Sequence, residues 1–208
     1  GVKPHFVITC ETKPYGFFSG TDTRGIKLLA FSCSSSANLR LWEGDYCFYN
    51  WMIHDDFYSE LWQTAGEDLG FVATGSIVLT QAVSIALGCG ISTLVLAGND
   101  LGFSDRYYVS GSAGAESGCN SIYRLKTGAT IEMDAVRRSR DYEIIRGGRV
   151  VHTNNQFLAA RLWLEDLFKS TPCQVFDASY PGCADGSVKK ITLEEYFAMK
   201  YSIRKKRR

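Results

Sequence analysis

The stretch that decides the fold runs from Phe71 to Ser104 and reads FVATGSIVLTQAVSIALGCGISTLVLAGNDLGFS. Its first part predicts a helix that begins after Ser76, because apolar residues recur at helical spacing as far as Leu87. These apolar residues nearly surround the helix, so the sequence predicts that the helix is buried. Gly88 and Gly90 follow and are expected to end it.

A short apolar run and a polar pair come after that helix. Thr93–Ala97 is continuous, as in a strand that is buried on both faces of a parallel sheet. Asn99 and Asp100 follow at the carboxyl end, where open α/β sheets bind their ligands. Thr74–Ser76 precedes the helix, where a hydroxyl can cap free amides and a glycine lets an anion approach. Each cluster alone is more often an ordinary cap or turn, but together at one sheet edge they favour a ligand site.

The same stretch resembles the core of the motility accessory factor (Maf) family. The family pattern is roughly Gly-Gly-Ser-Val, an alanine-rich helix, a glycine, and then Ile-Leu-Val-Gly-Gln-Asp-Leu; Thr74–Ile77 and Leu94–Leu101 stand in the matching places. The family includes flagellin glycosyltransferases that use CMP-activated nonulosonic (sialic-acid-like) sugars, and archaeal hydroxymethyl-dihydropterin diphosphokinases. It is similar in fold to bacterial sialyltransferases. The resemblance therefore implies an α/β fold, a Rossmann-like three-layer sandwich with a mostly parallel central sheet.

The resemblance implies one domain over residues 1–200. A basic tail follows at residues 201–208, and we expect its five consecutive basic residues, Arg204–Arg208, to be disordered. Family members carry a further strand and a Gly-Pro-Ser-Leu turn ahead of the strand predicted at His5–Cys10. The first family strand is missing from this sequence, so we expect the chain to be part of a longer protein. By itself it should bind nucleotide weakly and turn over slowly.

A second match lies near the end of the domain. The family has the pattern Asn-Ala-Thr-x-Gly-Gly-Ala-x-Ile-x-Gly after a strand. In this sequence the matching places are taken by Asp177–Ser179 and Gly182–Gly186, which also follow a predicted strand. The resemblance implies that the helix start binds donor phosphate or sugar, that the Asn-Asp pair holds ribose, base or sugar hydroxyls, and that this last loop lines the opposite wall. The binding residues predicted in this way are Thr74, Gly75, Ser76, Gly98, Asn99, Asp100, Ser179, Gly182 and Gly186.

Asp100, Tyr108 and His54 are the catalytic candidates. Tyr108 stands roughly where the family has a histidine that would deprotonate the acceptor hydroxyl. A tyrosine with a pKa near 10 is a poor base without tuning, although its ring could stack on a base or a sugar. His54 is followed by Asp55 and Asp56, which could make it a general base with carboxylate support or a divalent-metal position. A surface turn is the commoner meaning of such a group.

Three functions are compatible with these residues. The first is Maf-type glycosyl transfer from a CMP-activated nonulosonic sugar, with flagellin as a candidate acceptor and backbone amides stabilising the leaving CMP. The alternative is ATP-dependent pyrophosphoryl transfer to a pterin alcohol, which needs Mg²⁺ and therefore carboxylates, such as Asp100 with Asp55, Asp56 or Asp177. The third is a non-catalytic domain that binds a nucleotide or a sugar.

Composition excludes other classes. The 208 residues are 45% hydrophobic and 22% charged, as in an ordinary globular protein long enough for a proper core. The formal net charge of +1 argues against a general nucleic-acid binder, and no apolar run is long enough to span a bilayer. The N-terminus does not resemble a signal peptide. Seven cysteines without paired spacing indicate a reducing cytoplasm, and three scattered histidines do not predict a metal cluster.

The sequence before and after Phe71–Ser104 predicts further strands and helices. Ser32–Ser36 could bind phosphate or sugar hydroxyls, but a plain polar turn after a strand is the commoner meaning. Further elements are expected as strands at Ile26–Phe31, Asp45–Trp51, Val150–Thr153 and Cys173–Ala178, helices after Ala37 and after Asn154-Asn155, and a hairpin arm at Tyr123–Glu132.

Overall fold

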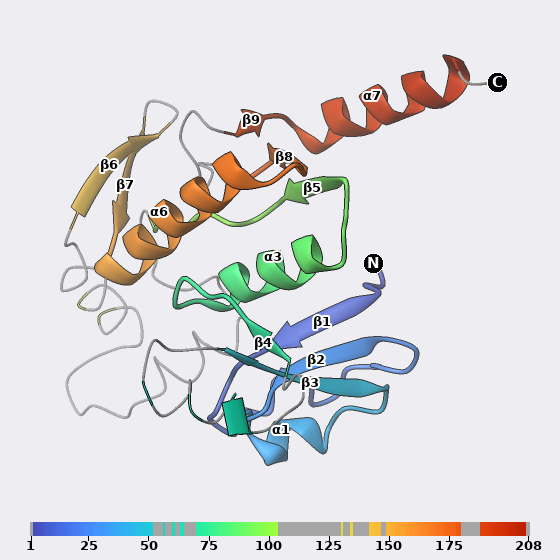
Figure 1. The fold of residues 1–208 in the computed structure, drawn as a ribbon, viewed down its shortest axis with the longest axis vertical. Coiled ribbons are helices and arrows are strands. Elements are labelled where there is room, and N and C mark those ends of the chain that lie inside the picture. Colours follow the sequence, from blue (N-terminus) through green and yellow to red (C-terminus); the bar gives the residue numbers. More distant parts are fainter. Residues whose placement is uncertain are drawn as a thin grey trace. The chain divides into compact units, whose positions relative to one another are not determined.

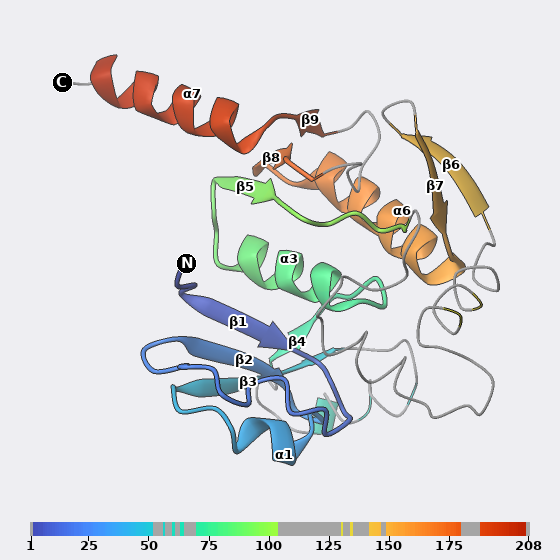
Figure 2. The ribbon, with the colours of Figure 1, turned by 180° about the vertical axis from the view of Figure 1, so that it is seen from behind.

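A computed structural model describes residues 2–51, 56, 60, 63–64, 70–103, 130, 134, 142–146, 149–179 and 188–206. The chain forms two compact units, which are described separately; the described part of the first ends at Ile85, and the second begins at Ala86. Both contain helices and parallel strands (Figures 1 and 2). The α/β class and the mostly parallel sheets predicted from the sequence are therefore confirmed, and the fold is Rossmann-like.

The first unit is built on a parallel sheet with strand order β1-β2-β3-β4. Its strands are β1 (Phe6–Thr9), β2 (Lys27–Phe31), β3 (Tyr46–Trp51) and β4 (Phe71–Val72). The first three match predicted strands, whereas β4 is too short for its side-chain period to be recognised in the sequence. Because all neighbouring strands are parallel, their carboxyl ends lie at the same edge of the sheet.

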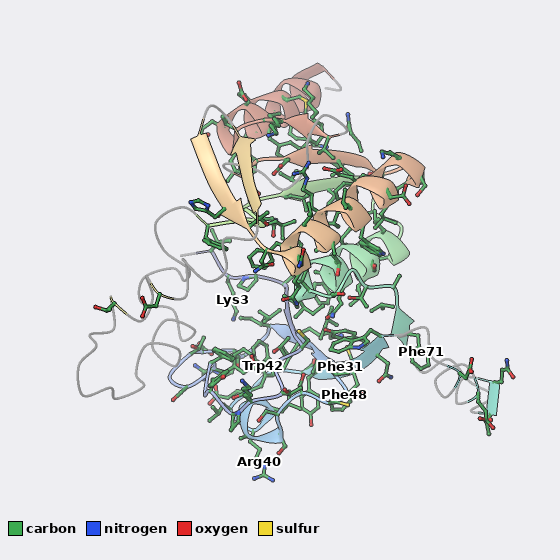
Figure 3. The ribbon with its side chains drawn as sticks, turned by 90° about the vertical axis from the view of Figure 1, so that its left-hand side faces the viewer. Lys3, Phe31, Arg40, Trp42, Phe48 and Phe71 are labelled. Atoms are coloured by element: carbon green, nitrogen blue, oxygen red, sulfur yellow. The ribbon has the colours of Figure 1, made fainter. Side chains whose placement is uncertain are left out.

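The two faces of this sheet are packed differently. Alternate residues of β2 point to opposite faces, so Leu28 and Ala30 reach one buried face while Phe31 lies on the other. Helix α1 (Ser36–Leu39) contributes to the first face. On the second face the ring of Phe31 stacks on Trp51, with ring centroids 3.5 Å apart. The buried cluster consists of Ile26, Leu28, Ala30 and Trp42, with Val7, Phe18 and Leu39 packed against it. Figure 3 labels Trp42 from this cluster and Phe31 from the other face.

Helix α3 (Val78–Gly88) is the helix predicted from the central stretch, and it leads from the first unit into the second. The prediction that this helix is buried is correct only for one part of its surface. Its fully buried side chains are Thr80, Gln81 and Val83, and its other apolar residues stay partly exposed. The two polar side chains can be buried because both are hydrogen-bonded to the turn that precedes the helix.

The second unit contains a parallel sheet with strand order β5-β8-β9. Its strands are β5 (Thr93–Leu96), β8 (Gln174–Asp177) and β9 (Lys189–Lys190). Leu96 pairs with Asp177, which in turn pairs with Lys190, so the three carboxyl ends lie at one edge. The predicted strands at Thr93–Ala97 and Cys173–Ala178 are thus confirmed within one residue at each end. β5 is only half-buried before Leu96, not buried on both faces.

A hairpin and two helices complete the second unit. β6 (Tyr142–Arg146) pairs antiparallel with β7 (Arg149–Thr153). Helix α6 (Asn155–Ser170) begins as predicted, where the side chain of Asn154 accepts a hydrogen bond from the Phe157 amide at 2.9 Å. Helix α7 (Leu193–Lys206) leads away from the β8–β9 end of the unit, on the side opposite the hairpin (Figures 1 and 2). None of the described helices is long and apolar enough to cross a membrane.

Two expectations about this unit need correction or stay open. Arg204–Lys206 are helical as part of α7, although a disordered tail was predicted there. Lysine and arginine are good helix formers, so a basic run can extend a helix that is already formed. The hairpin arm predicted at Tyr123–Glu132 lies outside the described residues except for Thr130. The β6–β7 hairpin was not predicted, although a Gly-Gly pair between two apolar runs is a known hairpin signal.

Candidate functional site

The carboxyl edge of the first sheet gathers polar groups around a buried tyrosine. The Tyr49 hydroxyl donates to Gln81 Oε1 at 2.6 Å and lies 3.3 Å from the carbonyl oxygen of Thr9, at the end of β1. Burial raises the pKa of Tyr49, and the nearby Cys10 thiol raises it further. The pKa of Cys10 is itself raised, mainly by burial and also by the charge of Glu11. Both groups are therefore protonated at neutral pH and cannot serve as a base or a nucleophile without a further change.

The turn before α3 is closed by its own side chains. The Gly75 amide donates to Thr80 Oγ1 at 2.8 Å, and the Ser76 amide donates to Thr74 Oγ1 at 3.1 Å. The Gln81 side-chain amide lies 3.4 Å from the same Thr74 oxygen and so connects the turn to Tyr49. Thr74 thus provides a hydroxyl to this turn, although the amide that it accepts from belongs to Ser76 and not to the helix itself.

This bonding changes where an anion could bind. The predicted site uses the amides of Gly75 and Ser76, but these two amides are already hydrogen-bonded to threonine hydroxyls. The next three amides, those of residues 77–79, make no hydrogen bond with the part of the chain that the structure describes. They begin an 11-residue helix, where the amide groups and the helix dipole both favour a negative charge. A phosphate near this turn would therefore meet residues 77–79.

The turn after β5 is held by residues from distant parts of the sequence. The Asn99 amide donates to Ser179 Oγ at 2.8 Å, and the Ser179 amide donates to the buried carboxylate of Asp177 at 2.9 Å. The Ala178 amide donates to the Leu96 carbonyl at 2.7 Å, which continues the pairing of β5 with β8 past the strand ends. The structure therefore brings together two predicted site residues, Asn99 and Ser179.

The far side of the same turn is fixed by β7. The Thr153 hydroxyl donates to the carbonyl oxygen of Leu101 at 2.9 Å, and both residues are buried. Phe103 and His152 exchange backbone hydrogen bonds of 2.8 and 2.9 Å. Gly102 has no room for a side chain, because a Cβ atom there would lie 2.6 Å from a methyl group of Val151. Two anchored positions thus flank Asp100, which is itself half-buried.

Backbone strain marks both turns. Of the residues that the structure describes, Ser76 (φ 77°) and Leu101 (φ 49°) are the two that are not glycine and have a positive φ. This conformation costs about 1–3 kcal/mol for such a residue, and it persists only where the surroundings enforce it. Strained residues of this kind cluster at ligand clamps and active sites. The two turns predicted as sites are therefore also the two strained turns of the described chain.

A scan against protein-family models matches residues 1–106 to the family described as 6-hydroxymethylpterin diphosphokinase MptE-like. The chain belongs to this MptE-like family. No curated protein and no solved structure shows a significant match to the chain. The matched half contains β1 to β5 and both strained turns. It stops before Thr153 and Ser179, the residues that anchor the second turn.

A divalent cation is implied by the diphosphokinase chemistry of this MptE-like family. No group of three potential ligands is present among the described residues. Asp177 is an unsuitable ligand, because its carboxylate is fully buried and accepts a hydrogen bond from Ser179. Among the described residues, Asp100 is a further carboxylate at the carboxyl edge of the second sheet. Mg²⁺ is usually held by one or two carboxylates together with substrate phosphates and water, so Asp100 fits a cation that arrives with a nucleotide.

Other predicted site residues lie outside the described part of the chain. These are His54, Asp55, Tyr108, Gly182 and Gly186, so their roles stay predictions. Gly98 has a φ of 71° and opens the turn after β5, where a glycine is required.

Four further residues form hydrogen bonds that hold the two turns in place, and the sequence alone did not identify them as part of a site. Thr80 and Gln81 had a signal, since both are polar residues inside an otherwise apolar helical run. Thr153 had one as well, since Maf-family members often have a threonine before the helix that is α6 here. Tyr49 had none, because it acts on a turn that is distant in the sequence.

Proposed function

We propose that this chain binds a nucleoside triphosphate and transfers its diphosphoryl group to the hydroxymethyl oxygen of a pterin. Membership of the MptE-like family supports this reaction over the other two functions considered. The structural observation that carries the proposal is the turn Gly98–Phe103. Hydrogen bonds from Ser179 and Thr153 hold this turn at both ends. It contains the strained residue Leu101 directly after the half-buried Asp100.

The reaction balances without any further reagent. The pterin hydroxymethyl oxygen attacks the β-phosphorus of ATP and forms a new P–O bond. The bond between that phosphorus and the oxygen that bridges to the α-phosphate breaks, and AMP leaves with the electron pair. The hydroxyl proton is released. A divalent cation bound to the phosphates would neutralise the charge that develops on their oxygens.

The proposal rests on the second unit, where Asp100 would hold the cation and Ser179 and Thr153 fix the turn that carries it. The start of α3, in the first unit, is a separate candidate for binding an anion, because the amides of residues 77–79 begin that helix. The buried Tyr49–Gln81–Thr74 hydrogen bonds hold that helix start against the sheet edge.

The test is to incubate the chain with ATP, Mg²⁺ and hydroxymethyl-dihydropterin and to measure AMP and pterin diphosphate. We expect the two products in equal amounts and none without the pterin. Release of ADP, or the absence of pterin diphosphate at any protein concentration, would contradict the proposal.

Glycosyl transfer from a CMP-activated nonulosonic sugar, with flagellin as acceptor, is the second candidate. The segment Leu94–Leu101 supports it, because its sequence resembles the Maf pattern as well. The two reactions differ in the nucleotide that they release. Production of CMP from a CMP-sugar, together with no AMP from ATP, would favour the second candidate. Binding of either nucleotide without turnover would instead favour a non-catalytic binding domain.

A further inference from the structure

We propose that helix α7 is a docking element for a membrane surface that contains anionic phospholipids. One side of this helix is apolar and exposed. The exposed fractions are 41% for Leu193, 54% for Phe197 and 67% for Tyr201, and these residues are spaced four apart, so they share one face of the helix. The face is a continuous stripe, not a single exposed residue.

The first turns of α7 hold this stripe in place. The Thr192 and Glu195 residues form a capping box, in which the Thr192 amide donates to the Glu195 carboxylate at 2.8 Å and the Glu195 amide donates to the Thr192 hydroxyl at 3.1 Å. The ring of Tyr196 packs edge-on against the buried Phe176 of β8, with centroids 5.6 Å apart. The helix start is therefore fixed to the unit, while Phe197 and Tyr201 remain exposed.

A shallow hollow of about 410 Å³ lies along the helix and combines aromatic rings with a positive charge. It is lined by Tyr196, Phe197, Lys200 and Tyr201. The Lys200 ammonium lies 5.5 Å from the centroid of the Tyr196 ring, a cation–π arrangement. Aromatic rings and lysine side chains are the groups that proteins place at the level of lipid headgroups, because each has an apolar body and a polar end.

The C-terminal segment Leu193–Arg208, which comprises α7 and the two residues after it, differs in charge from the remaining chain. It contains six basic and two acidic residues, a net charge of +4, whereas the whole chain has a net charge of +1. The other 192 residues therefore carry a net charge of −3. Basic residues beside an exposed apolar stripe are typical of helices that lie in the interface of an anionic membrane.

Two other occupants fit these observations less well. A second copy of the chain would place two strongly basic helices against each other, and Glu195 is already engaged in the capping box. A nucleic acid would be attracted by the charge and could stack on Phe197 and Tyr201, but it has no use for an exposed Leu193. An anionic bilayer accommodates both the charge and the whole apolar stripe.

The experiment measures co-sedimentation of the full chain with phosphatidylcholine vesicles, with and without phosphatidylglycerol. We expect binding only to the anionic vesicles and weaker binding as salt is raised. F197S/Y201S should reduce binding at least about tenfold, because apolar contact is lost. K205Q/K206Q should reduce it about tenfold or more, because each basic residue near the surface contributes to attraction.

Matched variants make the result specific. Leu162 on α6 is 55% exposed, as much as Phe197, so L162S tests whether any exposed apolar residue has the same effect. K27Q/R40Q removes two exposed positive charges from the first unit. Both control variants should bind the vesicles like the parent chain. Far-ultraviolet circular dichroism checks that each variant is folded, and the charge variants decide the question if F197S/Y201S does not fold.

Three results would overturn the inference. Equal binding to neutral and anionic vesicles would exclude a role for the charge. A dimer in light scattering that F197S/Y201S dissociates would show that a second copy covers the stripe. Binding of poly-uridine, with no binding to vesicles, would identify a nucleic acid as the partner. None of these results depends on the diphosphoryl-transfer assay, so the inference and the proposed function fail separately.

Discussion

The two strained turns are stabilised in opposite ways. In the turn before α3, the bonds to the Gly75 and Ser76 amides come from Thr80 and Thr74, no more than five residues away. In the turn after β5, the bonds at Asn99 and Leu101 come from Ser179 and Thr153, which are 80 and 52 residues away. The first turn can therefore form whenever its own segment is ordered, whereas the second exists only in the folded second unit. Chemistry that needs a precisely held carboxylate fits the second turn better.

The largest effect is expected at Asp100. Asp100→Asn keeps the size of the side chain but removes its charge, so we expect AMP release to fall about a hundredfold. The melting temperature should change little, because the turn keeps its anchors at Asn99 and Leu101. Steady-state assays at saturating Mg²⁺ measure the first quantity, and thermal denaturation the second.

Asp166→Asn on α6 is the matched control, since Asp166 is exposed and far from either turn in the sequence. Its activity should equal that of the parent chain. If Asp100→Asn lowered the melting temperature by several degrees and left activity intact, Asp100 would be a structural residue, and the assignment of chemistry to the second turn would be wrong.

The next largest effect is expected when each of the two residues with a positive φ is replaced by glycine. Leu101→Gly relieves the positive φ but removes a buried side chain, so we expect a loss of about 2 kcal/mol in the free energy of unfolding. Ser76→Gly relieves the same strain at an exposed position and should be neutral or stabilise by up to about 1 kcal/mol. Urea unfolding measures both. Equal effects of the same sign would show that the two turns do not differ as described.

A smaller effect is expected from the hydroxyl of Thr80. Thr80→Val keeps the shape of the side chain but leaves the buried Gly75 amide without its acceptor, which should cost about 1–2 kcal/mol. Thr21→Val, at an exposed threonine, is the control and should change stability by less than about 0.5 kcal/mol. An unchanged stability for Thr80→Val in urea unfolding would mean that the first turn does not depend on this bond.

The smallest effect is a pH dependence that arises from Tyr49. Its pKa is raised in the folded chain, mainly by burial, so above pH about 10 the unfolded state ionises while the folded state stays neutral. The contribution of Tyr49 to the free energy of unfolding is therefore complete below that pH. Above it the contribution decreases, by at most about 1.4 kcal/mol per pH unit. Urea unfolding from pH 8 to 11 compares the free energy of unfolding of the parent chain with that of Tyr49→Phe. We expect the difference between the two to decrease only above pH about 10. Tyr46→Phe, at an exposed ring on β3, should not change this slope.

Much of the fold could be predicted because the signals are local. The apolar run Thr93–Leu96 and the Asn154 cap were recognised within one or two residues, since a strand and a helix start each depend on a short segment. The burial of α3 was predicted correctly only in part, because apolar content alone does not show which face is covered. The helical state of Arg204–Lys206 was missed, because a run of basic residues resembles a tail when its neighbours on the helix are not considered.

The positions of both turns follow from local sequence, because a helix start and a strand end each depend on the residues next to them. Hydrophobic periodicity alone assigns Thr74–Ser76 to the start of α3 and Asn99-Asp100 to the end of β5. How each turn is held depends on contacts that form only when the chain is folded. The structure shows that the Gly75 and Ser76 amides are already hydrogen-bonded to threonine hydroxyls. It also shows that Ser179 and Thr153 fix the second turn, because parallel pairing of β5 with β8 and the Phe103–His152 bridge bring together segments that the sequence separates.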